Sequence, residues 1–345
     1  MSSTCDGESQ LEDRFHRTCL VILRRAIIIG NGFAGAENQC IGLVRALGFS
    51  NKYTLYRVNR PRGGINEKLH WLPVSVHKQL QGAVQWISGK RFRAKKLVPL
   101  PAEGKDVFEA DARHIAKVAQ DTFDRDGPIL VVASGRDTIA VASSIKKLVP
   151  ENVFLVQIQH PRSRLHKFDL VVLTVGALHQ ADSAALRNAT TAWYDEMALL
   201  PKPLLVVSIG GPTRRYGADL AMQLTTSLKS VLSTCGSLRI SFSRRTPKIV
   251  TDILMTELSN HPKVYIWNGE DPNPHMGHLA WADAFVITAD SVSMLSEACS
   301  TGVEGQLDHS PISENWHYSP LCDTEKAAGE VIKALAERGW RLLPQ

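Results

Sequence analysis

The sequence of 345 residues lacks any apolar run near the roughly 20 residues that a membrane-spanning helix needs. The best candidate, residues 20–29, is interrupted by Arg24 and Arg25 and is better explained as a buried strand over residues 26–29. Residues 1–13 contain four acids and no apolar core, which argues against a transit peptide or a signal peptide. We therefore expect a cytosolic protein.

Metal-binding cysteine pairs and common catalytic signatures are also missing. No Gly-x-Ser-x-Gly, His-Glu-x-x-His or Walker loop occurs, which argues against serine hydrolases, zinc proteases and P-loop enzymes. The six cysteines contain no Cys-x-x-Cys pair, so we expect reduced thiols and no metal site. These cysteines are Cys5, Cys19, Cys40, Cys235, Cys299 and Cys322.

Acidic residues are scarce in one window, residues 57–96. Ten basic residues and one acid, Glu67, give this window a net charge of +9, compared with +6 for the whole chain. Such a window attracts a membrane surface, a nucleic acid or an acidic protein, and the alternative is a solvated loop. We select as a partner or membrane surface Arg60, Arg62, Lys90, Arg91, Arg93, Lys95 and Lys96.

What the sequence does contain is strand and helix in regular alternation. Runs of Val, Ile and Leu bounded by glycine turns predict parallel strands covered by helices on both faces. The pattern occurs twice, which predicts an α/β fold of two Rossmann-like domains facing each other across a cleft. We divide the chain into a flexible N-terminus (1–23), an N-terminal domain (24–172), an incomplete C-terminal domain (173–320) and a C-terminal helix (321–345, with Thr324 as its cap).

A Gly-x-Gly-x-x-Gly motif follows the first strand, at residues 30–35. In dinucleotide-binding proteins an acid about 20 residues later binds the ribose, but here Arg57 and Arg60 occupy that stretch. Glu37, at the start of the next helix, would also repel a pyrophosphate. Arginines could suit NADP, but we interpret the motif as a tight turn that lines the cleft.

Two turns in the second half could hold a phosphate. Residues 210–217 join a buried strand to a helix and include Gly210, Gly211, Arg214 and Arg215. Residues 289–293 join another strand to a helix that carries Ser291, Ser293 and Glu297. Backbone N–H groups at a helix N-terminus favour an anion, so these seven residues form a candidate nucleotide-diphosphate site, vestigial or weak. We expect no bound cofactor and no catalytic base.

Several longer blocks resemble one family, the plant mitochondrial fission protein called elongated mitochondria one and its bacterial relatives. These blocks are residues 25–32, 37–48, 60–64, 157–162, 174–180, 215–220, 265–269 and the segment around Glu297. The resemblance implies a glycosyltransferase-B-like protein on the cytosolic face of the mitochondrial outer membrane. It implies that the protein helps to bring a dynamin-related GTPase to division sites, with no established catalytic activity.

The chain departs from the family pattern after residue 172 and again after Gly302, where the family has a linker and a further strand and helix. We interpret it as a shortened isoform or gene model. The sequence thus predicts a non-enzymatic adaptor in mitochondrial fission, with a dynamin-related GTPase and the outer membrane as partners and no nucleic acid. The alternative is a nucleotide-sugar-dependent glycosyltransferase with Glu297 on the ribose.

Overall fold

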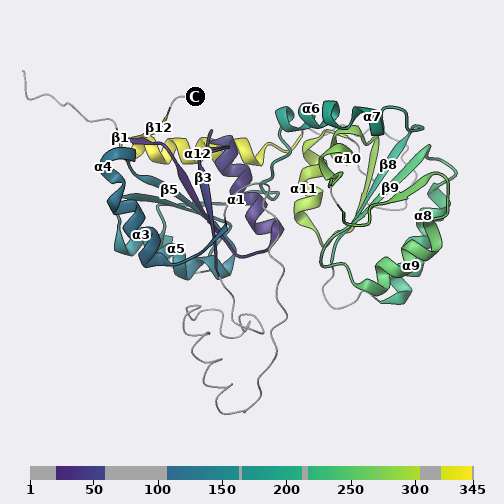
Figure 1. Cartoon of the computed structure of the whole chain (residues 1–345), viewed down its shortest axis with the longest axis horizontal. Helices are drawn as coiled ribbons and strands as arrows, with labels where there is room; N and C mark the ends of the chain where they lie inside the picture. The colour runs from purple at the N-terminus through teal and green to yellow at the C-terminus, as the bar shows by residue number, and fades with distance from the viewer. Residues whose placement is uncertain are drawn as a thin grey trace, which may run out of the picture.

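The protein folds into two α/β domains, and its last helix returns to the first domain (Figure 1). The structure is a computed structural model, and it describes residues 21–58, 107–162, 165–211, 217–270, 272–303 and 320–343. The basic residues selected between Arg60 and Lys96 therefore lie outside the described residues.

The first domain is built on a six-stranded parallel sheet. The strand order, β4-β3-β2-β5-β6-β7, is that of a Rossmann sheet. The central strands are rich in Ile, Val and Leu and are buried along their whole length, as a sheet covered on both faces requires. The strands are β2 (Ala26–Gly30), β3 (Tyr53–Arg57), β4 (Val107–Glu109), β5 (Ile129–Ser134), β6 (Val153–Ile158) and β7 (Leu170–Val172).

Helices cover both faces of this sheet. On one face, α3 (Ala112–Asp121) and α5 (Ile139–Leu148) pack against β2, β5 and β6, and the short α4 (Phe123–Asp126) follows α3. The carboxylate of Asp111 caps α3 by accepting a hydrogen bond from the backbone N–H of His114 (2.8 Å). On the other face lies α1 (Ala34–Ala46), whose buried Leu43 and Val44 join the core.

The second domain repeats this architecture with a four-stranded parallel sheet of order β10-β9-β8-β11. The strands are β8 (Leu204–Ile209), β9 (Ser237–Phe242), β10 (Val264–Ile266) and β11 (Ala284–Ile287). Two helices, α8 (Ala218–Val231) and α9 (Lys248–Leu258), share one core with the sheet. The other core includes residues of α7 (Tyr194–Met197), α10 (His275–Trp281) and α11 (Val292–Ser300), with α6 (Ser183–Ala192) packed against it. In the part of the chain that the structure describes, β11 pairs only with β8.

The C-terminal helix belongs to the core of the first domain. Buried residues of α12 (Asp323–Glu337), among them Val331 and Leu335, join the cluster formed by α1 and the sheet, and α12 lies along that domain in Figure 1. After α12, β12 (Trp340–Leu342) pairs in parallel with β1 (Val21–Leu23). The predicted flexible N-terminus, residues 1–23, therefore differs from the structure at its end, where residues 21–23 form strand β1. Helix α12 also begins earlier than predicted, with Cys322 as its cap in place of Thr324.

Residues 174–180 tie the two domains together. The backbone N–H of Gly176 donates to Asp323 Oδ2 (2.8 Å), and the N–H of Ala177 donates to Ser296 Oγ (2.8 Å). Thr324 does not cap the helix. Its Oγ1 instead accepts a hydrogen bond from the backbone N–H of His179 (3.2 Å). The predicted α/β fold of two Rossmann-like domains in a glycosyltransferase-B-like arrangement is confirmed, since each domain has its own parallel sheet and the last helix returns to the first.

Candidate functional site

The two domains face each other with the carboxyl ends of their sheets. Gly35, at the start of α1, lies against α11, so that a Cβ on Gly35 would come within 3.0 Å of Ser293 Oγ. Arg244, which follows β9, lies close enough to the first domain for its charge to interact with Glu37 and Arg57. Burial lowers the pKa of Arg244, Glu37 opposes that shift and Arg57 adds to it. The facing edges therefore bring loops of both domains together, as in α/β proteins that bind ligands between domains.

The turn of residues 30–35 already holds an anion, the carboxylate of Glu37. Glu37 Oε1 accepts a hydrogen bond from the backbone N–H of Gly32 (2.8 Å). A Cβ on Gly30 would collide with this carboxylate. Arg57 donates to both carboxylate oxygens, from Nε to Oε1 (2.8 Å) and from Nη2 to Oε2 (2.7 Å). A pyrophosphate at this turn would have to displace a buried and neutralised glutamate.

Gly210 and Gly211 lie where the turns after three strands meet. The N–H of Gly210 donates to Thr288 Oγ1 (2.7 Å), and the Gly210 carbonyl accepts from Thr246 Oγ1 (2.8 Å). A Cβ on Gly210 would collide with the Asp290 carboxylate, and one on Gly211 would collide with Arg245. These contacts give both glycines a packing role, and the Gly210 N–H that a phosphate would use is already bonded. The predicted partners Arg214 and Arg215 lie outside the described residues.

The start of α11 carries the two predicted serines. Ser291 is buried, and its N–H donates to the carbonyl of Thr288 (3.2 Å), which closes the turn before the helix. Ser293 is half-buried and faces Gly35 of the first domain. The structure therefore places Ser293 between the domains, whereas Ser291 is buried in the turn before α11.

Glu297 is buried one turn further along α11 and has a histidine partner that the sequence did not indicate. Its Oε2 lies 3.0 Å from Nε2 of His275, the first residue of α10. Burial lowers the pKa of His275, but the charge of Glu297 and the hydrogen bond to it outweigh burial, so that the pKa is raised. The charge of Glu297 also acts to raise the pKa of a second histidine, His179, but burial outweighs this effect and the pKa is lowered. Nothing in the sequence shows that the turn before His275 meets α11.

The predicted nucleotide site is therefore assembled in part. Ser291, Ser293 and Glu297 share α11, and Gly210 reaches the turn before that helix through Thr288. Over the described ranges, histidine, cysteine and acidic side chains form no group of three that could hold a metal ion. A search of the same ranges finds no helix with the length and hydrophobicity to cross a membrane.

Known proteins resemble this chain over most of its length. A relative from Arabidopsis thaliana, "Mitochondrial fission protein ELM1", is 47% identical over 398 aligned residues, which cover 93% of each chain. That alignment is longer than the 345 residues of this chain, so this chain lacks segments that the relative contains. "Uncharacterized protein RP120" of Rickettsia prowazekii (strain Madrid E) is 28% identical over 238 residues, which cover 55% of this chain and 67% of that protein.

Among solved structures, UDP-GlcNAc 2-epimerase from Methanocaldococcus jannaschii superposes with a TM-score of 0.48 at 12% identity, covering 82% of this chain and 83% of that one. The sequence profile of the family described as "Mitochondrial fission ELM1" matches residues 34–307. With this match and the Arabidopsis relative, the predicted family is confirmed: the chain belongs to the mitochondrial fission ELM1 family.

Proposed function

We propose that this protein is a non-enzymatic adaptor in mitochondrial fission. In this role it binds the cytosolic face of the mitochondrial outer membrane and helps to recruit a dynamin-related GTPase. One observation carries the non-enzymatic part: the protein's own groups occupy the positions that a donor nucleotide would use. Thr288 accepts the hydrogen bond of the Gly210 N–H, and His275 is paired with Glu297.

The basic residues between Arg60 and Lys96 are the proposed membrane and partner surface. Exposed charges are screened beyond about 8 Å at physiological salt, so binding through them depends on ionic strength. Each lysine or arginine near an anionic surface contributes about 1 kcal/mol, so seven residues suffice for reversible attachment. This segment supports peripheral binding to the membrane.

Flotation with liposomes tests the proposal directly. Vesicles that contain anionic lipids are mixed with the protein, with a purified dynamin-related GTPase, or with both. We expect the GTPase to float only when the protein is present, and high salt to release both. A variant with Arg60, Arg62, Lys90, Arg91, Arg93, Lys95 and Lys96 changed to glutamine should neither float nor recruit. Flotation of the GTPase without the protein, or retention of the protein after salt and carbonate washes, would refute this role.

A second candidate function is a nucleotide-sugar-dependent glycosyltransferase. The observation that favours it is the position of Ser293 and Glu297, which lie near the facing edges of the two domains on one helix. Calorimetry with UDP-sugars separates the two functions. The adaptor proposal predicts little heat, whereas submicromolar binding that is lost in Glu297→Ala would establish the enzyme.

A further inference from the structure

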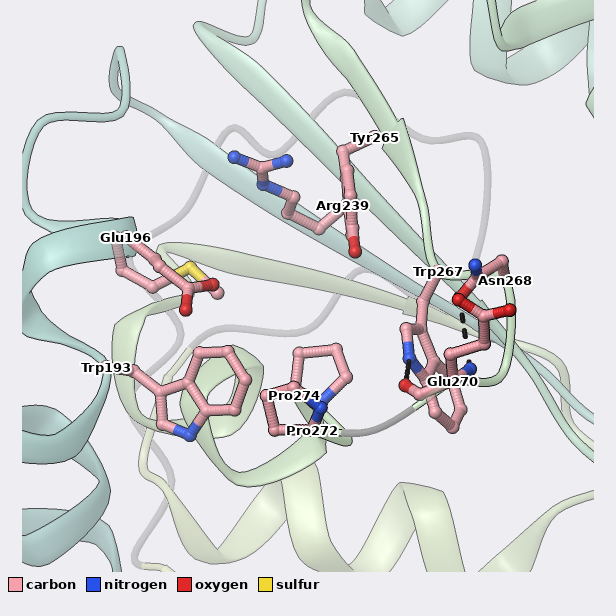
Figure 2. Close-up of a pocket in the computed structure, with 10 residues that line it drawn as sticks. Trp193, Glu196, Arg239, Tyr265, Trp267, Asn268, Glu270, Pro272 and Pro274 are labelled. Carbon is pink, nitrogen blue, oxygen red and sulfur yellow. Dashed lines mark hydrogen bonds between the residues drawn. The ribbon is translucent and has the colours of Figure 1, made fainter.

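The second domain contains a pocket on the side of its sheet that faces α7 and α10. Its volume is about 440 Å³, within the range of pockets that hold small ligands or peptide side chains. Figure 2 shows Arg239 and Tyr265 on one side of the hollow, with Trp193 and Trp267 on opposite sides of it. Pro272 and Pro274 lie between the two indoles in this view. Nothing in the proposed fission role or in the nucleotide site uses this pocket.

Arg239 supplies the pocket with a cation. In the described part of the chain it forms no ion pair within 4.0 Å, and its Nε is buried without a hydrogen-bond partner. Its guanidinium lies over the ring of Tyr265, 4.7 Å from the ring centroid. Burial lowers the pKa of Arg239, while Tyr265 and Glu196 oppose that shift. A stacked guanidinium of this kind presents its edge for bidentate contact with a carboxylate.

The aromatic walls of the pocket are fixed by backbone contacts. Trp193 packs against Gly277 of α10 so closely that a Cβ there would lie 2.5 Å from its ring. Trp267 is anchored because its Nε1–H donates to the carbonyl of Glu270 (2.6 Å). Rigid aromatic rings beside prolines suit a flat ring or a proline of a ligand, because little side-chain entropy is lost on binding.

The charges at the rim limit the class of anion. Glu196 and Glu270 are exposed and line the same pocket as Arg239. The two carboxylates repel any anion, and they repel a multiply charged phosphate chain more strongly than a single carboxylate. Peptide segments combine one carboxylate with an adjacent ring, and aromatic-lined grooves that bind proline-containing segments are a common mode of peptide recognition.

We propose that this pocket binds a linear segment of a partner protein in which an acidic residue adjoins an aromatic residue or a proline. The carboxylate pairs with Arg239, and the ring or proline packs in the hollow that Trp193 and Trp267 flank. The inference is independent of the proposed recruitment role, because it concerns a surface other than the basic segment.

Fluorescence anisotropy with a labelled, blocked peptide, Ser-Gly-Pro-Trp-Asp-Pro-Gly-Ser, tests the inference on the full chain. We expect saturable binding that weakens by about tenfold or more when the peptide Asp is replaced by Asn, because a charge-assisted hydrogen bond is lost. The variant Arg239→Gln should bind both peptides equally weakly. Equal affinity of the unchanged protein for both peptides, or no saturable binding, overturns the proposal.

Two exposed substitutions guard against loss of folding as an explanation. Glu196→Gln and Glu270→Gln each remove a repulsive rim charge and should tighten binding of the Asp peptide about twofold, with no effect on the Asn peptide. Unfolding cannot tighten binding. Weaker binding in Arg239→Gln together with tighter binding in the rim variants would therefore show that the pocket recognises the charge of the peptide. Unchanged affinity in both rim variants, or displacement of the peptide by equimolar UDP, would overturn the proposed ligand class.

Discussion

Glu37 and Arg57 form a bidentate ion pair across the first βα turn, with N–O distances of 2.8 and 2.7 Å. Glu37 lies in the first turn of α1 and Arg57 ends β3, so the pair joins the helix to the neighbouring strand. Only 6% of the Glu37 side chain and 16% of the Arg57 side chain are exposed, and solvent therefore screens the pair weakly. The glycine turn thus holds an internal carboxylate in place of a ligand phosphate.

Breaking this pair should destabilise the first domain strongly. Glu37→Gln or Arg57→Met alone leaves a buried charge without its partner, which costs about 3–5 kcal/mol. The double variant should lose much less than the sum of the two losses, as a double-mutant cycle from urea denaturation would measure. The exposed pair Lys248–Asp252 is the control, since Asp252→Asn there should cost about 0.5 kcal/mol or less. Additive losses at Glu37 and Arg57 would show that the pair is not coupled.

Alanine substitutions distinguish a packing role from a ligand role at the predicted phosphate turn. Gly210→Ala and Gly211→Ala drive a Cβ into Asp290 and Arg245, respectively, and each should lower the free energy of unfolding by about 1–3 kcal/mol. Gly211→Ala should cost more, because it meets backbone atoms as well as a side chain. Gly329→Ala in α12, where nothing lies within 4 Å, is the control and should stabilise the helix by about 0.5–1 kcal/mol. Thermal melts without added nucleotide check these values, and unchanged melting of the first two variants would leave only a ligand role for these glycines.

Acid should destabilise the protein through a buried histidine, His278. This side chain is 1% exposed, and neither ring nitrogen has a hydrogen-bond partner among the described residues. Burial, followed by the charges of His275 and Arg239, lowers its pKa to about 3. The unfolded chain takes up this proton below about pH 6.5 and the folded chain does not, so stability is retained above pH 6.5 and declines by about 1.4 kcal/mol per unit below it.

Replacing the histidine removes this loss. His278→Leu should show a shallower decline in unfolding free energy between pH 6.5 and 4 than the unchanged chain. At pH 8 His278 is neutral in both states, and the difference measured there isolates the packing effect of the leucine. Parallel curves for the two proteins across the whole range would contradict a low pKa for His278.

The edge strand β11 of the second sheet should make this chain less stable than longer relatives. Among the described strands β11 has a single neighbour, β8, and Val292 of α11 is 56% exposed. An unpaired edge favours aggregation. Leaving several hundred Å² of apolar surface in water costs on the order of 10 kcal/mol. A chimera that carries, after Gly302, the strand and helix that the family pattern predicts there should melt higher by about 10 °C or more. Melting within a few degrees, with both proteins monodisperse, would show that the chain compensates for the missing segment.

Local sequence pattern was sufficient for the central strands and long helices. The strand predicted at residues 26–29 agrees with β2, because continuous β-branched runs between turns have few other stable placements. Short elements escaped prediction. Val107–Glu109 and His275–Trp281 carry little periodic pattern, and tertiary contacts decide their structure.

The sequence by itself determined the family, the parallel α/β architecture and the candidate turns at Gly210 and Ser291, because these depend on residues close together in the chain. Only the tertiary structure decided that β1 pairs with β12 and that α12 belongs to the first domain. The same holds for the pairing of Glu37 with Arg57 and of Glu297 with His275. These contacts join residues that are 20 or more positions apart, and which side chains meet depends on how the sheets and helices pack. The glycine turn at residues 30–35 can be recognised in the sequence, but only the fold shows that the carboxylate of Glu37 occupies it.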